Sequence, residues 1–170
     1  MSEHFGKQLK QRMIKEQRTK DAVCKGCTKE EIKAMMDSQN VKRLPKIFRQ
    51  YLEVLGDGGL NAWSGIGRCH NIKIFKEDII YNMKRWGDGE TLPDDAFVFF
   101  NHHDVEFRYF LTDNDDDNPP VYEYIESSGD PIQIAKSITE YFDLLLLHTP
   151  FHALFRDRHR NRGNTKNSNK

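Results

Sequence analysis

Apolar residues recur with two different spacings along this chain, and the change of spacing predicts the order of its helices and strands. A spacing of three to four residues predicts helices at about 28–38, 45–55, 76–86 and 137–147. Runs of aromatic and β-branched residues predict strands at 71–75, 97–100, 105–111 and 121–125. The predicted fold is therefore α+β, a mostly antiparallel sheet packed by helices, in the order α-α-β-α-β-β-β-α.

The same spacings predict which side chains form the core. Alternation along the later strands places one face of the sheet against the helices and leaves the other face polar. One core is expected in a chain of 170 residues. Its expected members are Leu44, Phe48, Leu52, Phe99, Phe107, Tyr109, Val121 and Phe142.

The loop between the last two predicted strands carries the densest run of carboxylates. It reads Asp-Asn-Asp-Asp-Asp-Asn over 113–118 and is followed by two prolines, which cannot continue a strand. These residues must face solvent, a cation or a basic partner. The candidate contacts with a partner are Asp113, Asp115, Asp116, Asp117, Glu123 and Glu126, with Trp63 as a possible apolar anchor.

Charge is segregated along the chain although its net value is zero. Residues 1–50 hold 13 Lys and Arg against 6 acids, 88–143 hold 2 against 15, and 144–170 hold 6 against 1. A surface with such an acidic excess attracts cationic partners and repels nucleic acid. A solvated acidic rim that only keeps the protein soluble explains the same counts.

No apolar run is long enough for a transmembrane helix, and the first residues lack the apolar core of a secretory signal. A cytoplasmic protein without membrane contact is expected. Three cysteines, Cys24, Cys27 and Cys69, do not suggest a disulfide framework, and the cytosol would keep them reduced.

The Cys24-x-x-Cys27 spacing occurs in zinc sites and in redox sites, and it also fits a purely structural role. A zinc site needs four ligands, and Cys69 with His70 makes no recognisable second pair. The alternative is that Cys27 simply precedes a capping box, Thr28 to Glu31, at the start of a helix. We expect no structural metal. We also expect no cofactor, because the glycine-rich turn at 56–59 follows a helix, whereas a nucleotide-binding loop follows a strand.

The acidic region contains residues that suggest a catalytic site and residues that suggest a calcium site. His102, His103 and Asp104 supply groups used in hydrolysis, but neighbouring strand residues point to opposite faces and no nucleophile joins them. An EF-hand counted from Asp113 would need Gly at position 118 and Glu at position 124, and neither is present. We therefore expect that the protein is not an enzyme and that any cation binding is weak and incidental.

Several motifs occur in the order found in one known family. The chain resembles the SMI1/KNR4, or SUKH, superfamily in the order of these motifs. They are the helix start at 26–32, the motif Leu44-Pro-x-x-Phe-x-x-Tyr-Leu52 followed by Gly-x-Gly-Gly, the aromatic strands, and the helix at 137–147. The resemblance covers about 22–147. It implies a non-catalytic domain, and bacterial members act as immunity proteins that occupy a cognate toxin, often a nuclease, while others are interaction hubs.

The expected organisation is a basic extension at 1–21, a SUKH-like domain at 22–147 and a basic tail at 148–170. The first segment has few apolar positions, Leu9, Met13 and Ile14, so we expect it to fray. The leading functional hypothesis is an immunity protein that presents an acidic face to a nuclease toxin. The alternative is a regulatory scaffold, or a nucleic-acid-binding protein that acts through its basic ends.

Overall fold

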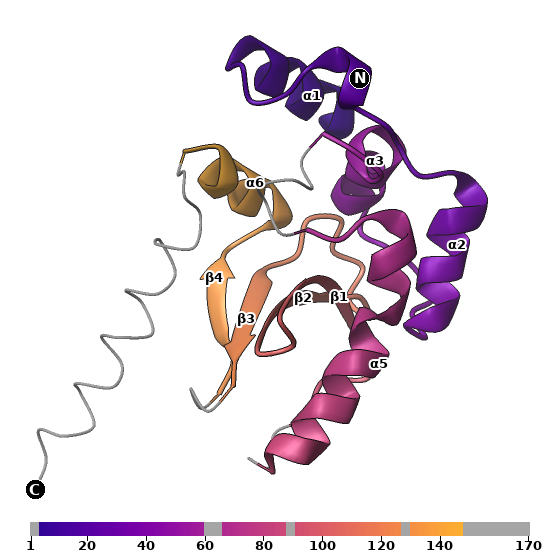
Figure 1. The fold of residues 1–170 in the computed structure, drawn as a ribbon, viewed down its shortest axis with the longest axis vertical. Coiled ribbons are helices and arrows are strands. Elements are labelled where there is room, and N and C mark those ends of the chain that lie inside the picture. The colour runs from indigo at the N-terminus through magenta and orange to yellow at the C-terminus, as the bar shows by residue number, and fades with distance from the viewer. Residues whose placement is uncertain (1–3, 60–65, 88–90, 127–129, 148–170) are drawn as a thin grey trace, which may run out of the picture.

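The computed structural model describes residues 4–59, 66–87, 91–126 and 130–147, which form one α+β domain (Figure 1). A single antiparallel sheet is covered by helices on both of its faces. The elements are α1 Phe5–Lys15, a 3-10 turn Asp21–Val23, α2 Lys29–Ser38, α3 Lys46–Leu55, α5 Cys69–Trp86, β1 Ala96–His102, β2 Glu106–Leu111, β3 Val121–Ile125, β4 Ile132–Ala135 and α6 Ile138–Leu147. This confirms the predicted fold class.

The four strands follow one another in the sheet in sequence order, and every neighbouring pair is antiparallel. Short hairpins explain this simple order, since antiparallel neighbours need only a turn between them. A register shift between Val98 and Phe100 marks an irregularity in β1. The predicted strands at 97–100, 105–111 and 121–125 are therefore confirmed as elements, with small changes at their ends.

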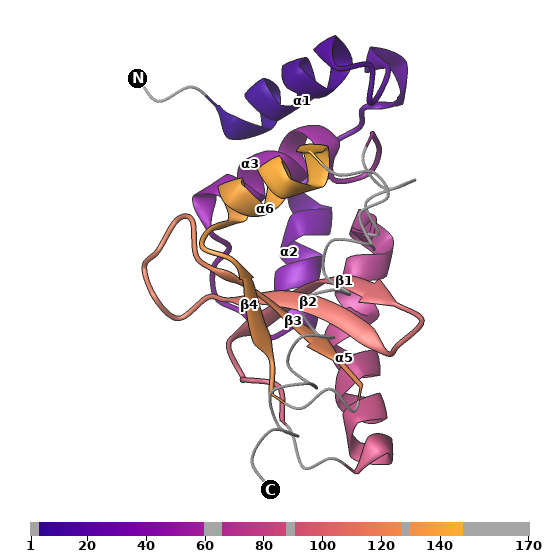
Figure 2. The ribbon, with the colours of Figure 1, turned by 90° about the vertical axis from the view of Figure 1, so that its left-hand side faces the viewer.

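Helices α3 and α6 lie side by side over one face of the sheet, with α1 stacked above α3 (Figures 1 and 2). The centre of this layer is aromatic: the ring of Phe48 on α3 lies 5.0 Å from Phe110 and 5.3 Å from Phe99. All eight predicted core residues are buried. Burial of such large rings is the main source of stability for a domain of this size.

Helix α5 corrects one strand prediction. The expected strand at 71–75 is the first part of this helix, because Ile72, Phe75, Ile79 and Met83 continue one buried stripe at helical spacing. The fourth strand is instead β4, in which Ile132 and Ile134 are buried and Gln133 is exposed. Within the described ranges, no helix is both long and apolar enough to cross a membrane.

The N-terminal segment also departs from expectation, because α1 packs firmly on the domain and does not fray. Leu9 and Met13 are buried against it, and Phe5 lies 5.6 Å from the ring of Phe142. Gly6 lets the two helices touch: a Cβ at this position would overlap the carbonyl oxygen of Gln50 on α3. Few apolar residues are enough here since Leu9 and Met13 are buried and Phe5 packs on α6, while Ile14 stays partly exposed.

Candidate partner-binding surface

The loop between β2 and β3 is fastened to the beginning of α3. Arg43 Nη2 donates to Asp117 Oδ1 at 2.7 Å, and its Nη1 donates to Asn114 O at 3.1 Å and to Asp115 Oδ1 at 3.2 Å. The backbone N–H groups of Lys46 and Ile47 donate to Asp117 as well. The carboxylate of Asp117 therefore caps the N–H of Lys46, and its backbone carbonyl accepts from the N–H of Ile47. A carboxylate is most favourable at this first turn.

The far end of the loop is fastened to α6. The side-chain oxygen of Asn118 accepts from the N–H of Thr139 at 3.0 Å, in the first turn of that helix. Asp116 accepts from the N–H of Asn118 at 2.8 Å, which closes a local turn. The loop stands out from the sheet in Figure 2, and these contacts give it one defined conformation.

Asp94 and Asp95, which precede β1, extend the acidic surface of this loop. Asp95 Oδ2 accepts from the N–H groups of Thr112 and Asp113, both at 3.2 Å. Below them the ammonium of Lys76 donates to the carbonyl oxygens of Asp94 and Gln39. Burial lowers the pKa of Lys76, and the carboxylates of Asp94 and Asp95 oppose that change.

We refer to these carboxylates together as the acidic corner: Asp94, Asp95, Asp113, Asp115, Asp116 and Asp117. Asp113, Asp115 and Asp116 face solvent, and Asp115 is fully exposed although it pairs with Arg43. Arg43 forms the ion pairs with this corner in the part of the chain that the structure describes. Most of the negative charge is therefore available to an approaching partner.

Glu123 corrects the predicted contact set, because it lies in the interior. Its carboxylate accepts from Arg108 Nε at 2.6 Å, and neither side chain is exposed to solvent. Arg108 also donates to Glu106 at 2.6 Å and to the hydroxyl of Tyr141 at 3.2 Å. Burial raises the pKa of Glu106, with Arg108 opposing the rise and Glu123 adding to it. This cluster braces the sheet against α6 and cannot contact a partner.

The expectation that only one face of the sheet is buried is wrong for the same region. On the face opposite Glu123, Tyr124 is buried, and its ring stacks on Phe107 at 5.2 Å and on Trp86 of α5 at 6.0 Å. Both faces of β3 are therefore covered. An alternating pattern shows which residues share a face, but not whether that face meets solvent.

The structure separates Glu126 from the acidic corner. Glu126 follows β3, so it lies about 16 Å of extended strand away from the loop before Val121. It is close instead to the turn between β1 and β2, where its N–H donates to Val105 O. Trp63, the predicted apolar anchor, lies outside the described residues.

The histidines of the β1–β2 turn do not assemble a catalytic set. His103 and Asp104 have positive φ angles of 53° and 60°, and together they form the tight turn. His102 Nδ1 lies 3.9 Å from Glu106 Oε2, beyond hydrogen-bonding distance. Across the residues that the structure describes, no three His, Cys, Asp or Glu side chains form a group that could hold a metal ion.

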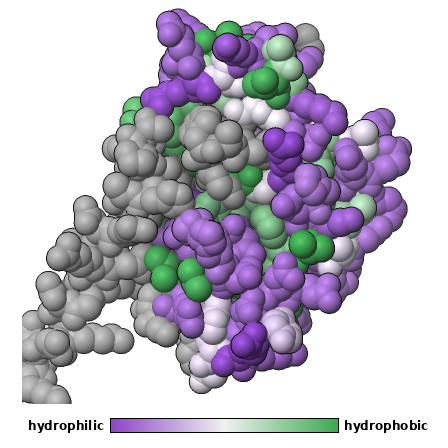
Figure 3. Space-filling model, viewed as in Figure 1, coloured by the Kyte–Doolittle hydropathy of each residue, from purple (hydrophilic) through white to green (hydrophobic). Residues whose placement is uncertain are grey.

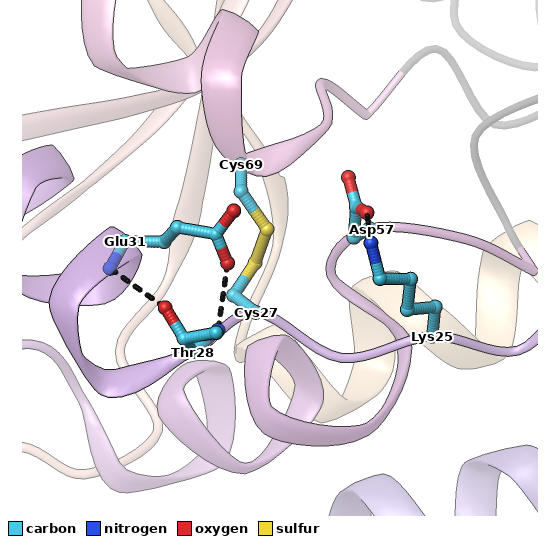
Figure 4. Close-up of a disulfide and its surroundings, with 6 residues drawn as sticks. All are labelled: Lys25, Cys27, Thr28, Glu31, Asp57 and Cys69. Carbon is cyan, nitrogen blue, oxygen red and sulfur yellow. Dashed lines mark hydrogen bonds and ion pairs between the residues drawn. A yellow bond between two sulfur atoms is a disulfide. The ribbon is translucent and has the colours of Figure 1, made fainter.

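The cysteines contradict the expectation of reduced thiols. Cys27 and Cys69 form a disulfide with 6.0 Å between their Cα atoms, while Cys24 is a free thiol. The bridge lies beside the Thr28–Glu31 capping box, which is present as predicted (Figure 4). It joins the residue before the N-cap of α2 to the first residue of α5.

The sequence predicts the acidic loop but not its attachment to α3 through Arg43. Arg43 gave no signal by itself, because a single arginine between Lys42 and Leu44 looks like an ordinary exposed residue. Asp94 and Asp95 form an acidic pair before an apolar strand, and this could have been taken as part of the same surface. The face of the molecule drawn in Figure 3 is mainly hydrophilic, with separate small apolar groups among the described residues.

The described elements define a class of protein: an α+β domain with an antiparallel sheet, a helical layer and polar loops at the ends of the strands. A family model described as SMI1-KNR4 cell-wall, SUKH_6, matches residues 30–142. The chain therefore belongs to the SMI1/KNR4, or SUKH, superfamily, which confirms the resemblance seen in the sequence. The family is generally non-catalytic. No curated protein matches the chain.

Helix α1 lies outside the matched range. It nevertheless makes one of the larger interfaces of the domain, with α3, and Arg12 at its centre pairs with Asp143 on α6. Helix α1 thus packs on the matched part of the domain although it lies outside the matched range.

Proposed function

We propose that this protein is a cytoplasmic, non-catalytic immunity protein that binds a cognate nuclease toxin through the acidic corner. Membership of the SUKH superfamily supports a binding role. A nuclease that binds phosphate has a basic cleft, and a carboxylate cluster of opposite sign competes for that cleft. Identification of a nuclease as the partner rests on this complementarity.

The observation that carries the proposal is the combination of exposure and attachment in one loop. Asp113, Asp115 and Asp116 face solvent, while Asp117 and Asn118 hold the loop to α3 and α6. A loop that is already ordered loses little conformational entropy when it binds. Exposed carboxylates in a fixed arrangement therefore form a better anion mimic than a flexible acidic segment.

Protection of cells that express a cognate nuclease toxin, to be sought among the genes beside this one, tests the proposal. The variant Asp113→Asn/Asp115→Asn/Asp116→Asn removes three charges and leaves Asp117, the residue that caps α3. A matched control, Glu30→Gln/Glu77→Gln/Asp130→Asn, removes the same number of exposed carboxylates elsewhere. We expect the first variant to lose protection and the control to keep it. Equal protection by both would contradict binding through the acidic corner and move the contact surface elsewhere. Absence of protection by the wild type would favour a regulatory scaffold.

A further inference from the structure

The three cysteines of this chain meet at one turn. Residues 23–27, here called the cysteine strap, run along the turn 56–59 that follows α3. The N–H of Cys27 donates to Leu52 O at 2.8 Å, and the N–H of Asp57 donates to Lys25 O at 2.8 Å. Figure 4 shows the disulfide from this strap to α5, with the Lys25–Asp57 ion pair next to it.

Two glycines of the turn make room for two sulfur atoms. A Cβ at Gly56 would lie 2.5 Å from Cys27 Sγ, and a Cβ at Gly59 would lie 3.3 Å from Cys24 Sγ. Both sulfurs therefore contact the same short turn. Cys24 is half-buried and free, and its thiol donates to Lys20 O at 3.4 Å. The bridge thus has a thiol on the same strap, three residues away.

The surroundings of the bridge favour a thiolate at Cys69. This residue is the first of α5, so its sulfur lies at a helix N-terminus, where negative charge is stabilised. Near the bridge, Lys25 interacts electrostatically with Asp57, Glu31 and Arg68. Asp57 is paired with Lys25, and Glu31 accepts from the Thr28 N–H, so both carboxylates already have partners. A sulfur that is stable as a thiolate leaves readily in disulfide exchange.

We infer that the cysteine strap is a site of internal thiol–disulfide exchange. The Cys24 thiolate attacks Cys27 Sγ, the Cys27–Cys69 bond breaks, and its electron pair leaves on Cys69. The products are a Cys24–Cys27 disulfide and a Cys69 thiolate, and the proton lost by Cys24 goes to solvent. One disulfide replaces another, so the step needs no oxidant or reductant.

The exchange requires the strap to bend. Residues three apart in an extended chain are separated by about 10 Å, whereas a disulfide needs Cα atoms about 4.4–6.8 Å apart. Gly26, between the two cysteines, is the natural position for that bend. In the observed state Gly26 is packed against Glu53, where a Cβ would overlap the carbonyl oxygen. Exchange therefore pulls the strap off the end of α3 and disconnects it from α5.

The exchange determines whether the cysteine strap is covalently linked to α5. In the observed state the bridge ties together residues 42 apart in sequence. After exchange the new bridge closes only a short ring, and α5 has no covalent link to the strap.

Trypsin separates the three cysteines and makes the exchange measurable. Cleavage after Lys20, Lys25, Lys29, Arg68 and Lys73 places Cys24, Cys27 and Cys69 in the peptides 21–25, 26–29 and 69–73. The full-length oxidised protein is incubated with iodoacetamide and no reductant, quenched in acid, digested and examined by mass spectrometry. The comparison is wild type against Cys24→Ser, with equal thermal melts as the control for folding.

In the wild type we expect the alkyl group to appear on 69–73 over time, together with disulfide-linked 21–25 and 26–29. Cys24→Ser should lose both signals. Labelling confined to 21–25 in the wild type would overturn the inference. So would labelling of 69–73 at the same rate in Cys24→Ser, because Cys69 would then be released without Cys24.

Discussion

Arg43 Nη2 lies 2.7 Å from Asp117 Oδ1, and the same oxygen accepts from the N–H of Lys46 in the first turn of α3. One carboxylate thus joins an arginine, a helix start and the loop that follows β2. Because Asp117 is used in this way, the loop presents its other carboxylates from a fixed base. This relationship links the packing of the domain to its proposed binding surface.

Replacement of Arg43 by Gln should loosen the loop without unfolding the domain. The pair is largely exposed, and exposed pairs contribute only about 0–1 kcal/mol to stability. Hydrogen exchange should become faster at the amides of Lys46 and Ile47, which both donate to Asp117. Arg49→Gln on the same helix is the control. Unchanged exchange in Arg43→Gln would mean that the loop is held without this pair.

Glu123 should affect stability and leave the binding surface unaltered. Glu123→Ala leaves Arg108 charged in the interior, and loss of one partner of a buried pair costs about 3–5 kcal/mol. Chemical denaturation measures this loss. The triple variant Arg108→Met/Glu106→Gln/Glu123→Leu should lose less than Glu123→Ala, since it leaves no unpaired charge in this cluster. An equal or larger loss would show that the pair itself is a major source of stability.

Tyr51→Phe should leave the domain as stable or make it more stable. Tyr51 is fully buried, and within the described residues its hydroxyl has no hydrogen-bond partner. An unsatisfied buried polar group costs about 1–3 kcal/mol, so its removal relieves a penalty. Tyr141→Phe is the matched comparison, because the Tyr141 hydroxyl accepts from Arg108. A larger loss for Tyr51→Phe than for Tyr141→Phe in thermal melts would contradict this assignment.

The disulfide should contribute to stability, whereas chelators should have no effect. Removal of a native bridge of this loop length costs about 2–4 kcal/mol, so reductant should lower the Tm of the wild type. Cys27→Ala/Cys69→Ala should have the same lower Tm with or without reductant. Chelation should leave the Tm unchanged, since a structural zinc site would couple metal binding to folding. A fall in Tm on chelation would restore the metal hypothesis.

The sequence predicted the fold class and the core because these follow from local periodicity. It could not separate strand from helix at 71–75, since Ile72 and Ile74 alternate with Asn71 and Lys73. Ile72 and Phe75 also fit a helical stripe. Contacts of α5 with α2 and β1 decide that choice. The Cys27–Cys69 pairing was equally hidden, because it depends on how residues 42 apart meet in the fold.

The candidate site was predicted in part for a similar reason. A run of aspartates before two prolines can only be an exposed loop, so that part followed from composition. The burial of Glu123 depends on Arg108, which lies opposite it in the register of β2 and β3. A carboxylate and an arginine on adjacent strands were visible in the sequence, but their pairing needs the register. The attachment of the loop to Arg43 required the tertiary structure.

The dependence of the association rate on ionic strength tests the central claim most directly. The measurement uses purified wild type, the Asp113→Asn/Asp115→Asn/Asp116→Asn variant and the matched control, each with the inactive toxin. The Debye length falls from about 10 Å at 0.1 M salt to about 3 Å at 1 M, so association steered by the acidic corner should slow steeply as salt rises. We predict a steep slope for the wild type and the control and a shallow one for the variant. Equal slopes for all three proteins would contradict the account.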